Sequence, residues 1–312
     1  MNNEIMVSVC FITYNHFKYV SQALDSILIQ KTSFRYEIVI GDDCSKDNTQ
    51  QILNEYKERF PDKINLTLRK ENIGATKNIY DIVMKCNGKY LIILEGDDYW
   101  IGDQKLQRMV DFLESNPSFI GVSHVRERRD INGILLGTDP DDYLINKSLS
   151  IKDFLEGKRF SATATLFRNV FMNSNDKYRH IATVSKYVCD LTYCILLLDV
   201  GDIFILNECW GAYRVRNAAG ESNYNSIRDT YGMYQDHISI VRAIDKFYNG
   251  KYNFYREYVK WNSFIVYHTL RECKVKLLFS TLKDMTFREK ILLFFYGPIM
   301  YFEHIRKKLG EK

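Results

Sequence analysis

Three carboxylates crowd the segment ILEGDDYW, residues 93–100. Glu95, Asp97 and Asp98 occupy three of four consecutive positions, directly after an apolar run typical of a buried strand. Like charges at this spacing raise one another's pKa unless a cation lies among them. Carboxylate oxygens bind hard cations such as Mg2+ and Mn2+, usually with a substrate phosphate completing the shell. The segment therefore indicates a metal site, and the alternative is a solvated turn whose acids cap a helix that begins near Gln104.

Polar residues also follow two other apolar runs. Asp42 and Asp43 end the run YEIVIGDD, and the triplet TYN at residues 13–15 ends the run VSVCFIT. An acidic side chain at such a place can accept a hydrogen bond from a nucleobase N–H or a ribose hydroxyl. The alternative for the aspartate pair is an Asx turn that leads into the next helix.

The first 120 residues alternate strand and helix patterns. Strands that are apolar on both faces and separated by helices of about 12 residues imply a parallel sheet covered on both sides. In such sheets ligands bind beyond the carboxyl ends of the strands, so the three polar groups should meet at one edge. The expected strands are 7–13, 36–43, 64–69 and 90–94, and the expected helices are 20–28, 48–60, 75–86 and 104–117.

The pattern changes after about residue 119. It predicts a hairpin around Asn132 and Gly133, and it becomes helical from about Tyr224 to the end. We therefore expect one α/β domain over residues 1–220 and a helical extension over 221–312. The later part of the α/β domain has a predicted helix at 150–157, a strand at 161–168, a helix at 187–201 and a strand at 203–208.

Several classes of protein are excluded. The chain has no G-x-G-x-x-G after its first strand and no G-x-x-x-x-G-K-[ST]. Dinucleotide-binding proteins and P-loop proteins therefore lose their main support. A receiver domain would need acids after strand one, where this chain has TYN. The net charge of +4 is too small to predict nucleic-acid binding. Seven cysteines without a CxxC pair predict reduced thiols in a cytosolic protein, and the first residues resemble a strand, not a signal peptide.

The most apolar stretch, ILLFFYGPIMYF at residues 291–302, lies among lysines and arginines. Twelve residues are too few to span a bilayer, which needs about 20. As a helix it could lie in a membrane interface, or it could pack against the protein's own core. Both readings remain open, and we expect peripheral membrane contact, where it occurs, through residues 274–312.

The order of these motifs resembles the family 2 glycosyltransferases, which have the GT-A fold. The resemblance rests on VSVCFITYNHFKYVSQALDSIL, YEIVIGDDCSKDNT and ENIGATKNIYDIVMKCNGKYLIILEGDDYW. It covers about residues 5–117 and continues more weakly to YRVR at residues 213–216. It implies a Rossmann-like, mostly parallel sheet flanked by helices, and transfer of a sugar from a nucleotide with inversion.

The resemblance also implies roles for individual positions. Tyr14 looks like the residue that lies against the base, and Asp43 matches the second acid of the family's DDGS motif, which would bond the base, usually uracil. Asp97 and Asp98 would contact a metal ion, Mn2+ or Mg2+, and Asp190 in VCDL matches the general base. The implied nucleotide-binding residues are Thr13, Tyr14, Asn15, Asp42, Asp43, Lys77, Glu95, Asp97 and Arg216.

Two positions depart from the family's pattern. Glu95 replaces the first acid of D-x-D, so a water or ribose contact is expected there in place of direct coordination. Arg216 replaces a histidine that can ligate the metal. An arginine cannot ligate a cation but can grip a diphosphate, so Arg216 or Arg214 is expected near the phosphates.

The expected function is therefore a metal-dependent inverting glycosyltransferase that uses a nucleotide sugar, with UDP as the expected nucleotide. The expected acceptor is a glycan or lipid-linked saccharide in surface polysaccharide assembly (capsule, lipopolysaccharide or O-antigen), on the cytoplasmic face of the plasma membrane. Two alternatives remain. One is a non-catalytic nucleotide-sugar-binding scaffold of the same fold; the other, a nucleotidyltransferase, lacks its glycine-rich opening here.

Overall fold

The computed structural model describes residues 4–309, except for residue 188 and residues 216–229. The chain separates into two compact units, one of residues 1–154 and 158–223 and the other of residues 155–157 and 224–312. The predicted functional division at residue 220 stays a prediction.

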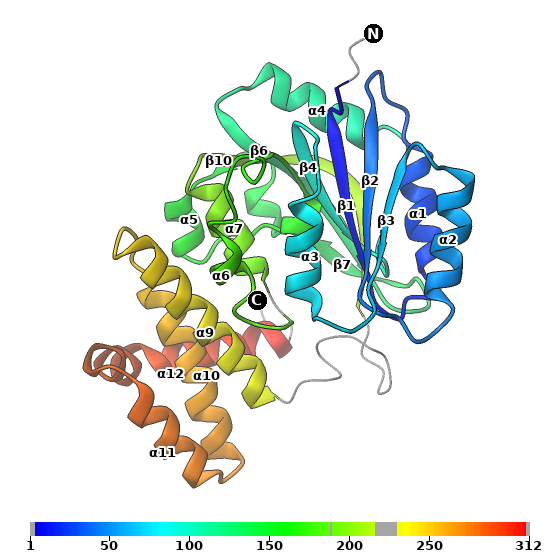
Figure 1. Cartoon of the computed structure of the whole chain (residues 1–312). Coiled ribbons are helices and arrows are strands. Elements are labelled where there is room, and N and C mark those ends of the chain that lie inside the picture. Colours follow the sequence, from blue (N-terminus) through cyan, green and yellow to red (C-terminus); the bar gives the residue numbers. More distant parts are fainter. Residues whose placement is uncertain (1–3, 188, 216–229, 310–312) are drawn as a thin grey trace. The chain divides into compact units, whose positions relative to one another are not determined.

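The described residues of the first unit form a ten-stranded sheet with the path β3-β2-β1-β4-β9-β6-β10-β5. Its β3-β2-β1-β4 half is parallel throughout (Figure 1). Strand β10 is parallel to β6, whereas β9 is antiparallel to both β4 and β6. The α/β class with a mostly parallel central sheet is therefore confirmed. The strands are β1 (Val7–Thr13), β2 (Tyr36–Asp42), β3 (Ile64–Leu68), β4 (Tyr90–Glu95), β5 (Tyr99–Trp100), β6 (Phe119–Arg129), β7 (Leu135–Asp139), β8 (Lys147–Leu149), β9 (Thr165–Arg168) and β10 (Asp202–Arg214).

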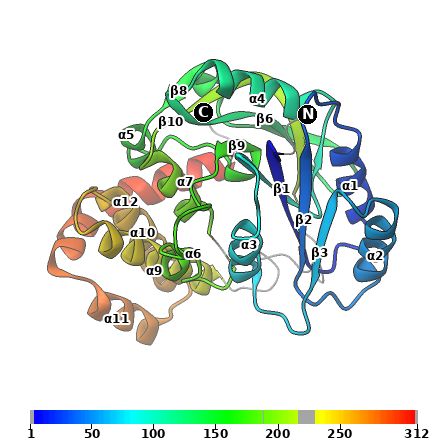
Figure 2. The ribbon, with the colours of Figure 1, turned by 45° about the horizontal axis from the view of Figure 1, so that its top comes forward.

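Helices cover both faces of the parallel half, because alternate residues of its strands are apolar on each side. The helices α1, α2 and α4 pack on one face through a core cluster that includes Val9, Leu24 and Met109. Helix α3 lies on the other face (Figure 2), where the Cys10 thiol of β1 points to the Ile79 carbonyl. The helices are α1 (Val20–Leu28), α2 (Thr49–Arg59), α3 (Ala75–Val83), α4 (Lys105–Ser115), α5 (Ile151–Leu155), α6 (Arg179–Ala182) and α7 (Asp190–Leu198), with short 3-10 turns at Asp142–Leu144 and Ala162–Ala164.

The register aligns the ends of three neighbouring strands. Thr13, the last residue of β1, pairs with Asp42, the last residue of β2. On the other side Ile12 pairs with Glu95, the last residue of β4. The loops that follow β1, β2 and β4 therefore leave the sheet at one edge, as the sequence predicted.

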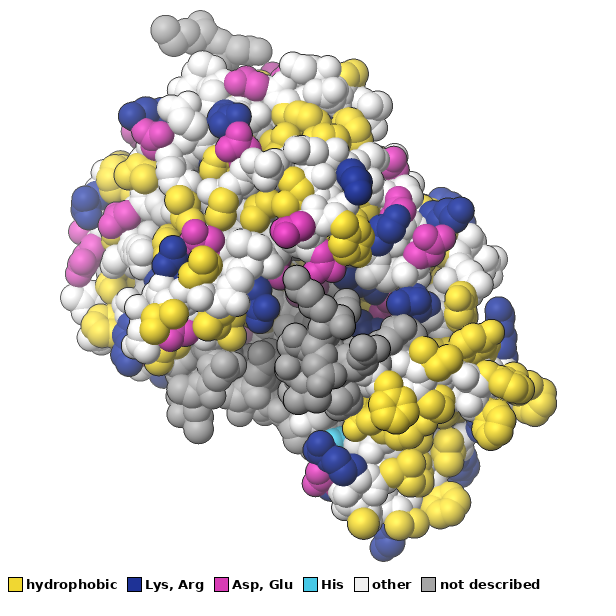
Figure 3. All heavy atoms as spheres, turned by 180° about the vertical axis from the view of Figure 1, so that it is seen from behind, with side chains coloured by type: hydrophobic (Ala, Val, Ile, Leu, Met, Phe, Trp, Pro, Cys, Tyr) yellow, Lys and Arg dark blue, Asp and Glu magenta, His cyan; other side chains and the backbone are white. Residues whose placement is uncertain are grey.

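The described residues of the second unit form four helices: α9 (Thr230–Tyr248), α10 (Tyr255–Arg271), α11 (Val275–Asp284) and α12 (Phe287–Leu309). Helix α10 contacts each of the other three. The Tyr234 ring of α9 packs against Trp261 and Phe264 of α10. Many apolar side chains of this unit nevertheless lie on its surface (Figure 3). Among the described residues, no helix combines the length and the hydropathy that crossing a membrane requires.

Candidate active site

Asp42 holds the loop after β2. Its side chain is fully buried and accepts hydrogen bonds from the Ser45 backbone N–H at 2.9 Å and from Gln50 Nε2 at 2.6 Å, and the Ser45 hydroxyl also donates to it. This is the Asx-turn alternative that the sequence left open. The geometry of this loop therefore depends on Asp42. The predicted contact between Asp42 and a nucleotide stays a prediction.

Asp43 reaches across the edge of the sheet to the loop before α3. Its two carboxylate oxygens accept the backbone N–H groups of Ile73 at 2.8 Å and Gly74 at 2.9 Å. Burial raises the pKa of Asp43, and these two bonds oppose the rise. Gly74 has a φ of +93°, and a Cβ there would lie 2.8 Å from the Lys186 carbonyl oxygen, so this close approach requires glycine. Each carboxylate oxygen keeps a second lone pair for a further donor.

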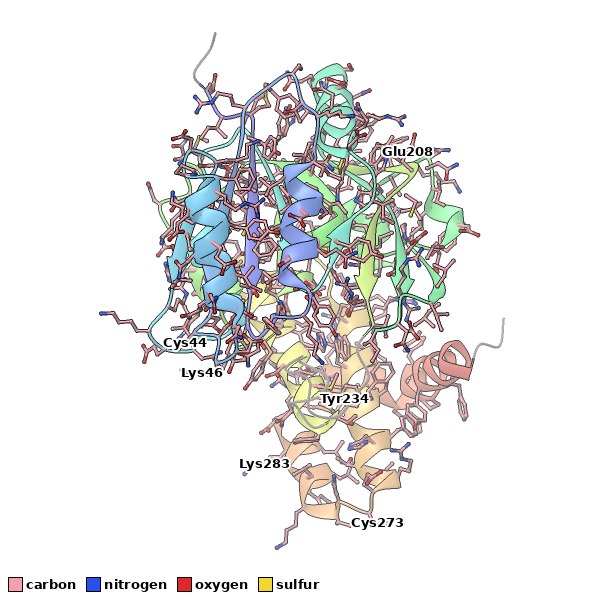
Figure 4. All side chains as sticks on the ribbon, turned by 90° about the vertical axis from the view of Figure 1, so that its right-hand side faces the viewer. Cys44, Lys46, Glu208, Tyr234, Cys273 and Lys283 are labelled. Carbon is pink, nitrogen blue, oxygen red and sulfur yellow. The ribbon has the colours of Figure 1, made fainter. Side chains whose placement is uncertain are left out.

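The residues after β1 form a tight loop against the loop after β2. Asn15 has a φ of +56°, its N–H donates to the Ser45 hydroxyl at 2.9 Å, and its side chain accepts the Lys46 N–H at 2.7 Å. The Lys46 ammonium in turn lies 3.0 Å from the Cys44 sulfur, as Figure 4 shows for these two labelled side chains. Tyr14 lies half-buried within this loop. The predicted base-contacting residues Tyr14 and Asp43 therefore come from two loops that bond to each other.

The acidic cluster after β4 is held in the protein, not in a solvated turn. Asp97 and Asp98 are 8% and 5% exposed. Burial, reinforced by the neighbouring carboxylates, raises the pKa of Glu95 well above its ordinary value and that of Asp98 to about 8. Gly96 permits the tight turn between them, because a Cβ would lie 2.8 Å from the Thr13 hydroxyl. The charge repulsion that the sequence indicated is present.

Within the part of the chain that the structure describes, two arginines face these acids, and one of them is Arg214 at the end of β10. Its backbone N–H donates to Asp98 Oδ1 at 2.8 Å, and its guanidinium donates to the Asp97 carbonyl oxygen and to Gln22. The guanidinium lies between two aromatic rings, 4.7 Å from the centre of Tyr19 and 4.8 Å from that of Tyr99. Arg214 therefore fastens the acid loop to β10 and to α1. Its expected role near the phosphates stays a prediction.

Arg126 of β6 is the second cation, and it is not among the site residues predicted from the sequence. Its positive charge lowers the pKa of Glu95, of Asp98 and of Asp190. Asp139 at 3.3 Å and the Thr163 hydroxyl at 3.0 Å hold its guanidinium. Arg126 lies more than 25 residues beyond the acids along the chain, and only the pairing of β6 with its neighbours brings them together. No local spacing could have revealed it.

Asp190 begins helix α7 and has an exposed surface. The surrounding protein nevertheless raises its pKa by desolvation, and Arg126 opposes this shift. The negative charge of Asp190 is also among the causes that raise the pKa of Glu95, so the two carboxylates lie within electrostatic reach of each other. The structure thus brings Asp190 to the acidic cluster from a segment almost one hundred residues farther along the chain.

Two further groups at this edge were missed. His16, after β1, has its Nε2 atom 3.9 Å from Asp97 Oδ1, although the six histidines show no ligand spacing in the sequence. Lys105, the first residue of α4, is 1% exposed and lies 4.3 Å above the Trp100 ring. A cavity of about 20 Å³ next to Lys105 is also lined by Asp98, His124 and Arg126. Trp100, 4% exposed, is part of the core.

The remaining predicted residues lie at the periphery or outside the described residues. Lys77 is exposed on the first turn of α3, three positions after Gly74. Arg216 lies outside the described residues, so its place is not shown. In the described ranges, no three His, Cys, Asp or Glu side chains are arranged to hold a metal ion.

Comparison with known proteins identifies the family. Residues 8–177, more than half of the chain, match the family model described as glycosyl transferase family 2. The chain belongs to this family. An uncharacterized protein of Mycobacterium tuberculosis is 40% identical to this family 2 chain over 111 residues, 36% of the chain and 32% of the relative. The chain thus spans about a third of the length of the first curated relatives that it matches.

A longer match joins the family 2 chain to TuaG of Bacillus subtilis, described as a putative teichuronic acid biosynthesis glycosyltransferase. The two are 27% identical over 241 residues, 75% of the chain and 89% of TuaG. Among solved structures, Staphylococcus aureus TarS 1–349 in complex with UDP-GlcNAc has a TM-score of 0.65 at 16% identity, over 98% of this chain and 93% of that one. A mannosyltransferase of Pyrobaculum calidifontis in complex with GDP-Man and Mn2+ has a TM-score of 0.53 at 14% identity, over 100% and 89%. These structures confirm the GT-A fold.

Proposed function

We propose that this chain transfers a sugar, with inversion, from a UDP-sugar to an acceptor hydroxyl, with a divalent cation bound at the acidic cluster. One observation carries the proposal. Strands β2 and β4 flank β1, and their ends present Asp43 on one side and Asp97 and Asp98 on the other, at the same edge of the sheet. Helix α7 brings Asp190 to the same place. The family membership and the UDP-GlcNAc complex of TarS support the choice of reaction and donor.

The donor nucleotide would lie against the loops after β1 and β2. Tyr14 offers an aromatic face for the base, and Asp43 offers acceptor lone pairs that the Ile73 and Gly74 bonds leave available. The loop Thr13–Asn15 and the buried loop Asp42–Ser45 are tied together before any ligand binds, because the Asn15 N–H donates to the Ser45 hydroxyl. A preorganised base site costs less conformational entropy on binding.

The residues present fit a divalent cation that is shared with a diphosphate. Glu95 and Asp98 have raised pKa values because the two arginines do not offset the burial and repulsion of the acids. Asp97 and Asp98 would hold the ion, since one or two carboxylates plus phosphate oxygens suffice for Mg2+ and similar ions. A bound cation would stabilise the negative charge of the departing diphosphate. The Mn2+ complex of the Pyrobaculum neighbour supports this proposal.

Asp190 would serve as the general base. As the acceptor oxygen forms its bond to the anomeric carbon, the bond from that carbon to the diphosphate oxygen breaks, and the hydroxyl proton passes to the Asp190 carboxylate. A single displacement inverts the anomeric carbon. The exposed surface of Asp190 leaves an approach for a large acceptor, and its raised pKa makes it a better proton acceptor than an ordinary aspartate.

The acceptor would be a glycan or lipid-linked saccharide of a surface polysaccharide, on the cytoplasmic face of the membrane. The support is the description of TuaG, which matches this chain over most of its own length. A second candidate, a scaffold that binds the nucleotide sugar without turnover, is favoured by Glu95 in the position of the family's first acid.

The deciding experiment measures thermal shifts of the full chain with a panel of nucleotide sugars, with and without Mn2+, followed by UDP release from whichever sugar binds. We expect UDP compounds to raise the melting temperature more with Mn2+ than without it. Asp97→Asn should remove the Mn2+-dependent part. Binding without UDP release, in the presence of glycan acceptors, would support the scaffold. No nucleotide response at all would refute the site.

A further inference from the structure

Helix α12 has an apolar face that the described protein does not cover. With 100° of turn per residue, Phe287, Ile291, Phe294, Phe295 and Phe302 fall on one side of the helix. Their exposed fractions are 79%, 42%, 77%, 64% and 64%, in the same order. Scattered exposed apolar residues are normal, but five large ones on one helical stripe mark an interaction surface.

This stripe is not the face by which α12 packs in its own unit. Glu289 lies opposite the stripe and is 6% exposed. Gly297 and Tyr301 lie on the flank of the stripe, where a Cβ added to Gly297 would lie 3.6 Å from Ser263 of α10 and Tyr301 stacks on Tyr267 of α10 with ring centres 4.5 Å apart. Helix α12 therefore packs on α10 beside the stripe and leaves the stripe itself open.

Helix α11 adds to the open surface. Val275 and Phe279 lie one helical turn apart and are 57% and 67% exposed. In the space-filling view, the yellow side chains of this unit gather into a broad patch with dark-blue lysines and arginines around it (Figure 3). We call the exposed apolar residues of α11 and α12 named here the aromatic face.

The charge around the aromatic face is positive. Lys276, Lys283, Arg288 and Lys290 are all exposed, and within the described ranges no carboxylate pairs with any of them. Lys283 points away from the neighbouring helices (Figure 4). Residues 274–312 contain nine Lys and Arg against four Asp and Glu, whereas residues 1–273 contain 34 against 35. The basic excess of the chain therefore lies entirely in the segment that carries the aromatic face.

We propose that the aromatic face binds the surface of an anionic phospholipid bilayer. Aromatic side chains on the flank of a helix insert at the boundary of headgroups and acyl chains, and lysines beside them pair with anionic headgroups. Helix α12 would lie parallel to the bilayer plane, because its uncharged stretch from Ile291 to Phe302 is too short to cross. A protein partner would need an apolar surface that matches the aromatic face. The lysines and the arginine around this face favour an anionic membrane surface instead, because no carboxylate of the described protein pairs with them. This inference does not depend on the proposed reaction.

The test is co-sedimentation of the full chain with vesicles of phosphatidylcholine alone and of phosphatidylcholine mixed with phosphatidylglycerol. We expect binding to the mixed vesicles that weakens as salt is added. The double variant Phe294→Ser/Phe295→Ser should lower the bound-to-free ratio about tenfold or more. The variant Lys283→Glu/Arg288→Glu should abolish the preference for the anionic vesicles.

The matched control is Ile134→Ser/Leu135→Ser, which removes two apolar side chains, 61% and 53% exposed, from the β6–β7 hairpin. It should bind vesicles like the unchanged chain. Light scattering after size-exclusion chromatography tests the competing explanation, in which a second copy of the chain covers the aromatic face. A dimer that Phe294→Ser/Phe295→Ser dissociates, with no vesicle binding by the unchanged chain, would overturn the proposal. So would equal vesicle binding by that variant, shown to be folded by its melting curve.

Discussion

At the scale of single residues, the positive charges at the site do not fully compensate the carboxylates. Arg126 and Arg214 lower the pKa values of the neighbouring acids, yet burial and mutual repulsion still hold the pKa of Asp98 at about 8. Arg214 is tied to the Asp97 carbonyl and to Gln22, so it cannot move closer to the carboxylates. The uncompensated negative charge is what a cation would bind.

Asp190 gives the most direct residue-scale prediction. Asp190→Asn removes the carboxylate that we propose as the proton acceptor, so it should lower kcat by about 10²- to 10⁴-fold, with UDP affinity unchanged. Because desolvation raises the pKa of Asp190, the rate of the unchanged enzyme should fall with acidification at a higher pH than an ordinary aspartate, near 3.8, would cause. The measurement is UDP release against pH, with UDP titration calorimetry alongside. Asp199→Asn, at the other end of α7, is the control and should keep full activity.

Lys105 gives a prediction on stability. Burial lowers the pKa of Lys105 well below its ordinary value of 10.5, so the unfolded chain binds its proton more tightly than the folded one. Stability from this group therefore increases as the pH rises toward 10.5. Lys105→Met keeps the apolar stem and removes the buried amine, so it should stabilise the protein by about 1–3 kcal/mol near neutral pH. The gain should vanish as the pH approaches 10.5.

Urea unfolding at several pH values measures this effect. The exposed Lys152→Met is the control and should show no pH-dependent gain. A loss of stability in Lys105→Met at neutral pH would mean that Lys105 compensates Asp98 more than burial penalises it.

Residue types and spacing could predict about half of the site. The acids after β2 and β4 were found because they directly follow apolar runs, and both strands are parallel to β1, which lies between them. Arg126, His16 and Lys105 could not be found, since each lies on a different element and only tertiary packing brings it to the acids. Asp190 came from the family resemblance, because its own neighbourhood reads as an ordinary helix start.

At the scale of elements, the loop between β4 and β5 depends on one glycine. A Cβ on Gly96 would lie 2.8 Å from Thr13 Oγ1 and 2.9 Å from His16 Nδ1, closer than real contacts allow. Gly96→Ala must therefore push the acid loop away from β1, at a cost of about 1–3 kcal/mol. We expect Gly96→Ala to lower the melting temperature of the chain. We also expect it to weaken the rise in melting temperature that UDP and Mn2+ produce together.

Differential scanning fluorimetry with and without UDP and Mn2+ separates these two effects. The control is Gly201→Ala, where the nearest contact of an added Cβ is 3.4 Å. If Gly96→Ala kept the full ligand response, the turn would not position the acids.

Most elements of the first half were predictable, with ends that differ by a few residues, because strand and helix periods there are strong. Strand β10 was not: its predicted end at Glu208 lies six residues before its true end at Arg214. Its pairing with β6 shifts register between Leu206 and Cys209 and again before Gly211, which breaks the alternation that sequence patterns detect. The part of β10 that the pattern missed brings Arg214 to the acidic cluster.

At the scale of the whole chain, the sequence indicated a parallel sheet and a helical C-terminal region, but not how the sheet is completed. Strand β9 lies between β4 and β6, antiparallel to both, although it follows β6 by more than thirty residues. Pairing over such separations depends on the shape of the finished core and leaves no local pattern. The insertion of β9 also sets the position of β6, which carries Arg126. The sheet order and the position of Arg126 therefore escaped prediction for the same reason.

The seven cysteines test this arrangement across the chain. All are free thiols; Cys209 and Cys273 are exposed, and five are buried in and around the sheet. With an aromatic disulfide reagent, the native protein should therefore show two reactive thiols and the unfolded protein seven. Cys273 should react faster, because desolvation raises the pKa of Cys209 and lowers its thiolate fraction. The variant Cys209→Ser/Cys273→Ser should not react while folded, since the remaining thiols are reached only through unfolding. Rapid labelling of that variant at Cys10, which lies under α3 on β1, would contradict the packing on which the site depends.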